Sequence, residues 1–283
     1  MSTLPEMLDL ARPLFMGILN VTPDSFSDGG LYGEIRIALT RAQVMKQEGA
    51  DLIDIGGEST RPGAERVDVA TQLSRIIPVL EALMGDAELS SRLLISVDTT
   101  QSRVADVALN LGAGMINDVS AGTDDPEILD VVAAHRVPIV LMHMRGTPKT
   151  MQNNPVYNDA RSEVLGYLVS RIDAAISAGI ARENIILDPG IGFGKRKEDN
   201  LMLLAHLDSF VELGFPVLLG ASRKRFMGAI CKERQPKELL GATIATTVLG
   251  VRAGVRLFRV HDVKENRQAA FVTAAVISRH GKE

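Results

Sequence analysis

The chain has 283 residues, enough for one large domain, and its 46% hydrophobic and 23% charged residues are typical of a globular protein rather than a disordered one. A formal net charge of −4 argues against a surface that binds nucleic acid or an anionic membrane. The apolar runs are of strand length and shorter than the roughly 20 residues that span a bilayer, so no membrane segment is expected.

Eight short apolar runs recur in chain order, each followed by a stretch with the features of a helix. The runs are Leu14 to Val21, Leu52 to Gly57, Leu94 to Asp98, Met115 to Val119, Pro138 to His143, Ile185 to Pro189, Val217 to Ser222 and Leu257 to Asp262. They are rich in Val, Ile and Leu without a clean alternation of polar and apolar residues, which is typical of strands buried on both faces in a parallel sheet. Eight such units predict an α/β fold, a (β/α)8 TIM barrel.

The barrel is expected to form a single domain, because no linker or change of composition divides the chain. Residues 14–283 are assigned to it and residues 1–13 to an N-terminal extension. This extension carries Glu6 and Asp9 and lacks the basic and apolar regions of a signal peptide. Cys231 is the single cysteine, which excludes an intramolecular disulfide. These features predict a cytoplasmic protein.

The helical stretches between the runs end at glycines. The predicted helices cover Ile35 to Glu48, Val69 to Leu83, Ser102 to Leu111, Pro126 to His135, Ala160 to Ala178, Asn200 to Glu212, Lys237 to Ala253 and Lys264 to Ser278. Glycine escapes the Cβ clash of the left-handed C-cap conformation, which predicts that conformation at Gly49, Gly112, Gly179, Gly214 and Gly254. The long segments Thr22 to Gly33 and Gly56 to Glu65 are predicted to be lid or binding loops. No role is predicted for Gly146 to Asn158.

Polar residues lie in or at the carboxyl ends of the predicted strands, where a (β/α)8 barrel assembles its active site. They are Asn20, Asp54, Asp98, Asn117, His143, Asp188, Ser222, Arg259 and His261. Any one of them could instead cap a helix or bond to an exposed turn. Their occurrence on every strand favours a site.

Two basic clusters follow the sixth and seventh strands, at Lys195 to Lys197 and at Arg223 to Arg225. Solvated helix starts account for Arg196, Lys197 and Arg225, whereas an anionic small ligand is the alternative for the other cations. The loop Gly190 to Lys195 matches neither a P-loop nor a dinucleotide fingerprint. Its glycines still leave backbone N–H groups open, and Phe193 could form the wall of a pocket for a flat ligand.

Arg259 and His261 are two residues apart on one strand, so their side chains share a face. An arginine fork beside a histidine suits a phosphate or pyrophosphate group. Inward carboxylates such as Asp98 and Asp188 are costly unless they pair with Lys224 or Arg259, or with a donor-rich ligand such as an amino-pyrimidinone edge. The histidines show no metal-binding spacing, so a zinc site is not expected.

Two long segments identify a resemblance. Residues 16–30, MGILNVTPDSFSDGG, and residues 54–63, DIGGESTRPG, closely resemble the two signatures of the bacterial dihydropteroate synthase family of pterin-binding enzymes. Further matches follow in order, namely SVDT at 96–99, IND at 116–118, LMHM at 141–144, LDPG at 187–190, SRK at 222–224 and RVHD at 259–262. The resemblance runs from about Phe15 to the carboxyl end.

The resemblance implies an enzyme that joins 6-hydroxymethyl-7,8-dihydropterin diphosphate to p-aminobenzoate and releases pyrophosphate, with Mg²⁺ on the leaving group. It implies that the pterin binds to Asp98, Asn117, Asp188 and Lys224 in a slot lined by Met142, Gly192 and Phe193. It implies that Asn20, Arg61, Arg259 and His261 hold the pyrophosphate, Asn20 also meeting the metal. The p-aminobenzoate pocket would comprise Phe26, Thr60, Arg61, Pro62 and Ser222.

These roles imply a dissociative, carbocation-like displacement. Arg61, Arg259, His261 and Mg²⁺ would stabilise the departing pyrophosphate, and Asp98 would stabilise the positive charge left on the pterin and its methylene. Lys224 is counted with them among the catalytic residues. No covalent enzyme intermediate is expected, and the two long loops would close to exclude water.

Three other readings of the sequence remain. A pterin-binding methyltransferase module would share the slot but would not need Phe26 or the segment Thr60 to Pro62. A silent pterin-binding paralogue would lack Asn20, Arg61 or His261, all present here. A Schiff-base aldolase could use Lys224, although a lysine between two arginines suits anion contact at least as well. The family resemblance also implies a homodimer and competitive inhibition by sulfonamides.

Overall fold

The computed structural model describes residues 4–10, 12–22, 30–60 and 62–280, and its strands are parallel. The strands are β1 (Leu14–Asn20), β2 (Leu52–Gly56), β3 (Leu94–Asp98), β4 (Met115–Asp118), β5 (Ile139–Met142), β6 (Ile185–Asp188), β7 (Leu218–Leu219) and β8 (Leu257–Val260). They pair in the order β6-β5-β4-β3-β2-β1-β8-β7. A parallel bridge between Leu187 and Val217 joins the two ends of that order, and the Leu187 N–H donates to Pro216 O at 2.9 Å. The predicted barrel is confirmed.

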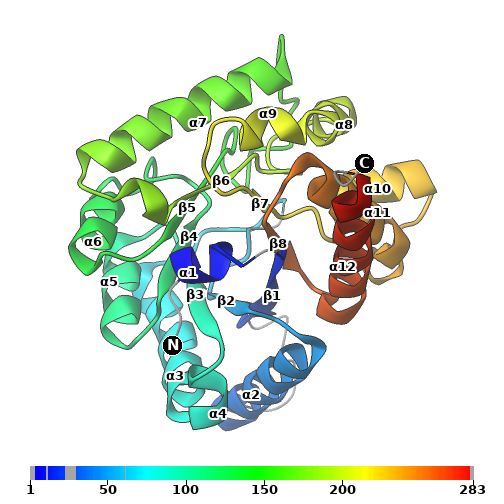
Figure 1. Ribbon diagram of the computed structural model, residues 1–283. Coiled ribbons are helices and arrows are strands. Elements are labelled where there is room, and N and C mark those ends of the chain that lie inside the picture. Colours follow the sequence, from blue (N-terminus) through cyan, green and yellow to red (C-terminus); the bar gives the residue numbers. More distant parts are fainter. Residues whose placement is uncertain (1–3, 11, 23–29, 61, 281–283) are drawn as a thin grey trace.

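Helices surround the strands, as Figure 1 shows. They are α1 (Leu4–Leu8), α2 (Gly30–Glu48), α3 (Val69–Gly85), α4 (Ala87–Ser90), α5 (Ser102–Asn110), α6 (Glu127–His135), α7 (Ala160–Ser177), α8 (Lys197–Ala205), α9 (Leu207–Val211), α10 (Arg225–Cys231), α11 (Leu240–Ala253) and α12 (Val263–His280). Two 3₁₀ turns, η2 (Arg182–Asn184) and η3 (Pro236–Glu238), precede β6 and α11. Within the described residues, no helix is both long and apolar enough to cross a bilayer.

The helix ends follow the glycine pattern. Gly49, Gly112, Gly179, Gly214 and Gly254 all have φ between 76° and 104°, which confirms the predicted left-handed positions. The helix predicted over Asn200 to Glu212 is instead two helices, α8 and α9. His206 between them has φ −125° and ψ 37°, outside the helical range, so the chain turns there. Helix α10 was not predicted.

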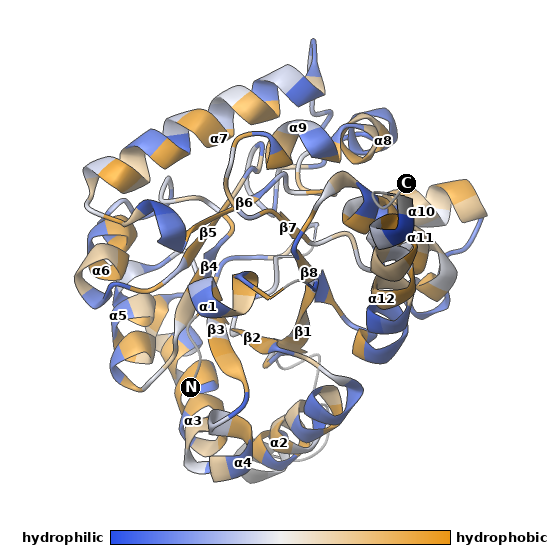
Figure 2. Ribbon diagram, in the orientation of Figure 1, coloured by the Kyte–Doolittle hydropathy of each residue, from blue (hydrophilic) through white to orange (hydrophobic). Residues whose placement is uncertain are grey.

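The strands separate two layers of core. Between strands and helices lies the larger apolar layer, and Figure 2 shows polar residues on the outer faces of the helices. Inside the barrel lies a smaller apolar layer near the amino ends of the strands, made by Leu14, Met16, Leu52, Leu94, Met115, Val140, Ile186, Leu218 and Leu257. Both faces of each strand are therefore buried, as the sequence predicts.

Helix α1 lies across the centre of the barrel in Figure 1, and Leu4 packs into the inner apolar layer. The Arg256 guanidinium donates to Leu8 O at 2.6 Å, and Arg12 pairs with Asp51 at 2.6 Å. Residues of the amino-terminal segment thus close the amino end of the barrel. The opposite end holds the carboxyl ends of the strands.

The closure by α1 generates a stability prediction. Leu4 is 1% exposed and Leu10 is 44% exposed. We expect Leu4→Ala to lower the free energy of unfolding by about 2–5 kcal/mol, because a buried leucine leaves a cavity. Leu10→Ala, the control, is expected to change it by less than about 0.5 kcal/mol. Urea unfolding measures both, and equal losses in the two variants would contradict the account of the closed end.

Candidate active site

The polar residues of the barrel interior lie one step along the strands from the inner apolar layer. Residues two apart on a strand point to the same side, so Leu52, Leu94 and Leu257 are followed on the inner face by Asp54, Ser96 and Arg259. Asp54 and Ser96 are fully buried, and Asn117 from β4 is 3% exposed. The strand register therefore creates a buried polar layer above the apolar one.

Asp54 is the acceptor that connects this polar layer. Its Oδ1 accepts from Ser96 Oγ at 2.6 Å. Its Oδ2 accepts from Asn117 Nδ2 at 2.9 Å and from Arg259 Nε at 2.7 Å. A buried carboxylate is tolerated when it is paired and hydrogen-bonded in this way. Asp54 thus fixes one amide and one guanidinium inside the barrel mouth.

Arg259 also binds the second carboxylate of this group. Its Nη2 donates to Asp98 Oδ2 at 2.9 Å, and Asp98 is 7% exposed. Burial raises the pKa of Asp98 to about 7; Arg259 opposes the rise and the charge of Asp54 adds to it. Asp98 therefore titrates close to neutral pH and can accept a hydrogen bond from a ligand or stabilise positive charge on it.

A second group of charges lies at the ends of β6 and β7. Burial raises the pKa of Asp188 to about 6, although a hydrogen bond from Gly190 N at 2.7 Å and the charge of Lys224 both oppose this. Burial, followed by the charge of Arg259, lowers the pKa of Lys224 to about 8. Lys224 Nζ lies 3.8 Å from the ring centroid of Phe193. A carboxylate, an ammonium and an aromatic face thus lie at one place.

His261 and Ser222 form the rim after β7 and β8. Ser222 Oγ lies 3.0 Å from His261 Nδ1, and the His261 N–H donates to the same Oγ at 3.3 Å. Arg223, between Ser222 and Lys224, has φ 57° and pairs with Asp262 through two bonds of 3.0 and 2.5 Å. This fork holds a backbone conformation that is unusual for a residue other than glycine. It thereby joins the β7 and β8 loops.

An apolar wall faces these charges. Met142, Phe193, Val119 and Met151 form one buried cluster, and Met144 packs against it. Gln152 Nε2 donates to Gly192 O at 3.1 Å, and Tyr157 Oη donates to Gly194 O at 2.8 Å. Residues of the segment Gly146 to Asn158, which had no predicted role, therefore brace the loop after β6.

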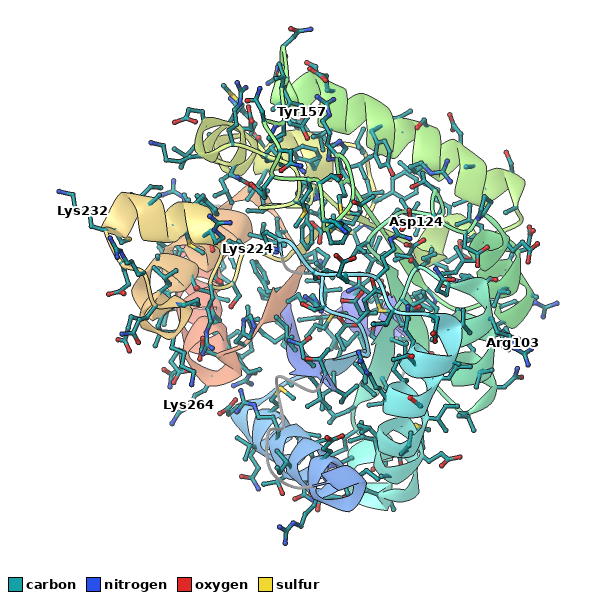
Figure 3. All side chains as sticks on the ribbon, turned by 180° about the vertical axis from the view of Figure 1, so that it is seen from behind. Arg103, Asp124, Tyr157, Lys224, Lys232 and Lys264 are labelled. Atoms are coloured by element: carbon teal, nitrogen blue, oxygen red, sulfur yellow. The ribbon has the colours of Figure 1, made fainter. Side chains whose placement is uncertain are left out.

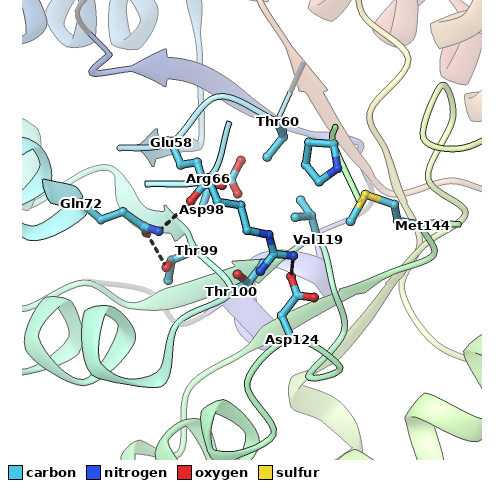
Figure 4. A pocket seen from close by; sticks show the side chains of 11 residues that line it. Glu58, Thr60, Arg66, Gln72, Asp98, Thr99, Thr100, Val119, Asp124 and Met144 are labelled. Carbon is cyan, nitrogen blue, oxygen red and sulfur yellow. Dashed lines mark hydrogen bonds and ion pairs between the residues drawn. The ribbon is translucent and has the colours of Figure 1, made fainter. Parts of the chain in front are cut away.

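The loop after β2 covers the adjoining part of the mouth. A cavity there is lined by Glu58, Thr60, Arg66, Gln72, Asp98, Thr99, Thr100, Val119, Asp124, Met144 and Pro148. Figure 4 shows Arg66 of this loop paired with Asp124, and Gln72 bonded to Glu58 and Thr99. Lys149 pairs with Glu65 at 2.7 Å. Figure 3 shows the molecule from behind the view of Figure 1 and labels Asp124, which lines this cavity, and Lys224.

The structure brings most of the predicted site residues together. Asp98, Asn117 and Arg259 bond to Asp54 or to one another, while Asp188, Lys224, Gly192 and Phe193 lie close together at the ends of β6 and β7, near Met142. Asn20 ends β1, and a Cβ on Gly56 would lie 3.5 Å from Asn20 Oδ1 and 3.6 Å from Asp98 Cβ. Thr60 lines the cavity and Pro62 is exposed. Phe26 and Arg61 lie outside the described residues.

The sequence interpretation missed three features of the site. Asp54 was recognised as polar but was not given its central position. An anionic ligand was one alternative for Lys195, but Lys195 is 3% exposed and bonds to protein atoms instead. Arg223 pairs with Asp262 rather than facing a ligand. The glycines before Lys195 were the available signal, because a glycine-rich loop can fold tightly enough to bury a side chain.

Comparisons with known proteins agree on a family. Residues 16–261 match the model of the family described as pterin binding enzyme. A Synechocystis protein named dihydropteroate synthase is 47% identical over 94% of this chain and 90% of its own length. A Xanthomonas albilineans dihydropteroate synthase solved with 4-aminobenzoic acid has a TM-score of 0.88 at 47% identity, covering 96% of this chain and 94% of that one. A Yersinia pestis dihydropteroate synthase in a sulfonamide drug complex has a TM-score of 0.88 at 42% identity, covering 95% and 96%.

The Asp54 network generates a second stability prediction. We expect Asp54→Asn to lower the free energy of unfolding by about 3–5 kcal/mol, because it removes one of the two carboxylates that compensate the buried charge of Arg259. Asp130→Asn, on the exposed face of α6, is the matched control and is expected to be near neutral. Both are measured by urea unfolding at neutral pH. An Asp54→Asn variant as stable as the control would show that the network does not hold the barrel mouth.

Proposed function

Because the chain belongs to the pterin-binding enzyme family, and within it to the dihydropteroate synthases, we propose how its own residues perform that reaction. The protein is a transferase of folate biosynthesis. It condenses 6-hydroxymethyl-7,8-dihydropterin diphosphate with p-aminobenzoate to give 7,8-dihydropteroate and pyrophosphate. One observation carries the assignment of roles, namely that two buried carboxylates, a guanidinium and an ammonium lie around an apolar wall at the barrel mouth.

Asp98, Asn117, Asp188 and Lys224 bind the pterin in this proposal. A pterin ring is flat and carries adjacent N–H donors along one edge, which buried carboxylates accept. Asp98 and Asp188 supply those acceptors. Met142, Gly192 and Phe193 then contact the faces of the ring, which suits their place in or beside the apolar cluster.

The diphosphate lies toward the rim, where Arg259 and His261 share a strand face with Asn20 nearby. Arg61, which lies outside the described residues, joins them by resemblance alone. Cations that meet the leaving group as its charge develops lower the barrier more than contacts made equally before and after. Arg259 is already oriented by Asp54 and Asp98, so no reorganisation of this guanidinium is needed.

The reaction then proceeds by dissociation. The bond between the pterin methylene and the diphosphate oxygen breaks, and its electron pair leaves with pyrophosphate. The positive charge left on the methylene and the ring is stabilised by the Asp98 carboxylate. The amine of p-aminobenzoate attacks the methylene and releases one proton to solvent. Thr60, Pro62 and Ser222, with Phe26 and Arg61, hold the p-aminobenzoate in this proposal.

The donor set of the chain is compatible with Mg²⁺ carried by the diphosphate. Among the described residues, no group of three or more His, Cys, Asp or Glu side chains could hold a metal ion. Mg²⁺ bound to phosphates needs only one or two protein oxygens, and Asn20 Oδ1 would supply one. When bound, the ion would neutralise charge on the departing pyrophosphate.

We propose a homodimer in the cytoplasm. An apolar groove is formed by side chains of α8, α9, α10 and α11. Leu201, Ile230 and Leu249 in it are 42%, 50% and 48% exposed. A second copy of the chain would cover these side chains. Sedimentation equilibrium gives the mass, and a monomer at micromolar concentration would contradict the proposal. A chain with one cysteine forms no intramolecular disulfide, which is compatible with a reducing compartment.

A coupled assay tests the reaction. With the pterin diphosphate, p-aminobenzoate and Mg²⁺, we expect pyrophosphate and dihydropteroate in equal amounts, and little of either when chelator removes the metal. A sulfonamide should inhibit competitively, because it resembles p-aminobenzoate, so that excess p-aminobenzoate restores the rate. Pterin binding without either product would instead indicate a silent pterin-binding protein.

The pH dependence of pterin binding tests Asp98 and Asp188. Only the ionised carboxyl offers both oxygens as acceptors, so we expect the affinity for 6-hydroxymethylpterin to fall as the pH is lowered through about 7 and then about 6. Asp188→Asn should weaken binding about tenfold to a hundredfold at neutral pH and abolish the step near the lower value. Calorimetric titration across this pH range measures both effects. The same pH profile in the variant and the parent would remove Asp188 from the site.

A further inference from the structure

A buried ammonium lies behind the slot and takes no part in the proposed chemistry. Lys195 is 3% exposed. Its Nζ donates to Gly190 O at 2.8 Å, Phe193 O at 3.0 Å and His143 O at 3.2 Å, and lies 2.9 Å from His143 Nδ1. An ammonium has three N–H donors and no acceptor, and the three carbonyl oxygens and the ring nitrogen are enough to satisfy all of them. None of the four is a carboxylate, and burial lowers the pKa of Lys195 to about 7.

His143 lies against the amino group of Lys195 and is uncharged. Lys195 Nζ and His143 Nδ1 are hydrogen-bond partners at 2.9 Å, and a protonated Lys195 that donates to Nδ1 places the proton of the neutral ring on Nε2. Burial, then the charge of Lys195, lowers the pKa of His143 to about 2, so the ring stays neutral. The ring packs edge-on to Tyr167 at 4.9 Å. His143 therefore serves as a fixed, uncharged support.

The loop after β6 is folded tightly around the ammonium. Gly190, Gly192 and Gly194 have φ of 68°, 87° and 62°, so their carbonyls can turn in ways that other residues resist. A Cβ on Gly190 would lie 1.9 Å from His143 O and 3.3 Å from Lys195 Nζ. Two carbonyl oxygens aimed at one buried point repel each other unless a donor lies between them. Lys195 provides that donor.

The other side of the same loop is the wall of the slot. Phe193 lies 3.8 Å from Lys224 Nζ, and a Cβ on Gly192 would lie 2.9 Å from Lys224 Cδ. The Gly192 N–H donates to Asn200 Oδ1 at 2.6 Å. Phe193 therefore contacts both lysines: its carbonyl accepts from Lys195, and its ring lies against Lys224.

We propose that Lys195 is a positioning residue for pterin recognition: its ammonium holds the carbonyls of Gly190 and Phe193 and thereby sets the Phe193 ring and Lys224 at the spacing that the pterin requires. This inference rests on the proposed function of the slot. Lys195 itself touches no substrate and donates no proton in the reaction.

Lys195→Met tests the proposal, because it keeps the length of the side chain and removes its donors. The probe is 6-hydroxymethylpterin, which lacks the diphosphate and so reports on the slot alone. We expect calorimetric affinity to fall tenfold or more, KM for the pterin diphosphate to rise in step, and kcat at saturation to fall less than threefold. Lys197→Met is the matched control, since Lys197 is exposed and pairs with Glu198 at 3.2 Å.

The urea midpoint and the pterin affinity together distinguish a positioning role of Lys195 from a purely structural one. A purely structural lysine predicts a lower urea midpoint with unchanged pterin affinity in the folded protein, and that result overturns the proposal. Lys195→Gln, which keeps two donors, should lie between Lys195→Met and the parent in affinity. If neither variant folds, the ammonium serves the whole barrel and the proposal is also overturned. An inactive parent and an inactive Lys197→Met would instead contradict the function proposed for the slot.

Discussion

The site depends on one fully buried carboxylate, Asp54, which lies next to the apolar layer that fills the amino end of the barrel. Removing a charge from water is costly, so the carboxylate is stable there only because Ser96, Asn117 and Arg259 bond to it. Arg259, held at Nε by Asp54, also donates from Nη2 to Asp98 at 2.9 Å. The hydrogen bonds that make the burial of Asp54 possible therefore also position the charged groups at the barrel mouth.

The loops at the barrel mouth are held in place by buried polar contacts, as the strands are. Lys195 fills the interior of the loop after β6, and the Arg223 fork with Asp262 joins the loops after β7 and β8. Residues after β5 brace the first of these loops through Gln152 and Tyr157. Functional side chains on loops become precise when their neighbours are locked by packing and hydrogen bonds. Among the described residues, the loops after β6, β7 and β8 are each held by contacts of this kind.

Much of the fold could be predicted from the sequence, because the signals are local. Apolar runs predicted the strands and glycines predicted the helix ends, whereas no glycine or proline marks the break at His206. The direction in which a lysine side chain points cannot be predicted from the sequence either. Lys195 and Lys224 both lie in basic clusters, yet Lys195 is enclosed by protein atoms and Lys224 lies against the Phe193 ring. The residues near the mouth could be named, but the identity of Asp54 as their common acceptor required the register of β2 with β3.

A crystal structure of the protein with 6-hydroxymethylpterin and pyrophosphate would test the central claim, that a network built before substrate arrives places the charges. We predict that Arg259 keeps its bonds to Asp54 and Asp98, that the donor edge of the pterin meets Asp98 and Asp188, and that pyrophosphate lies toward His261. A pterin bound outside the barrel mouth, or an Arg259 that leaves Asp54 to reach the ligand, would contradict it.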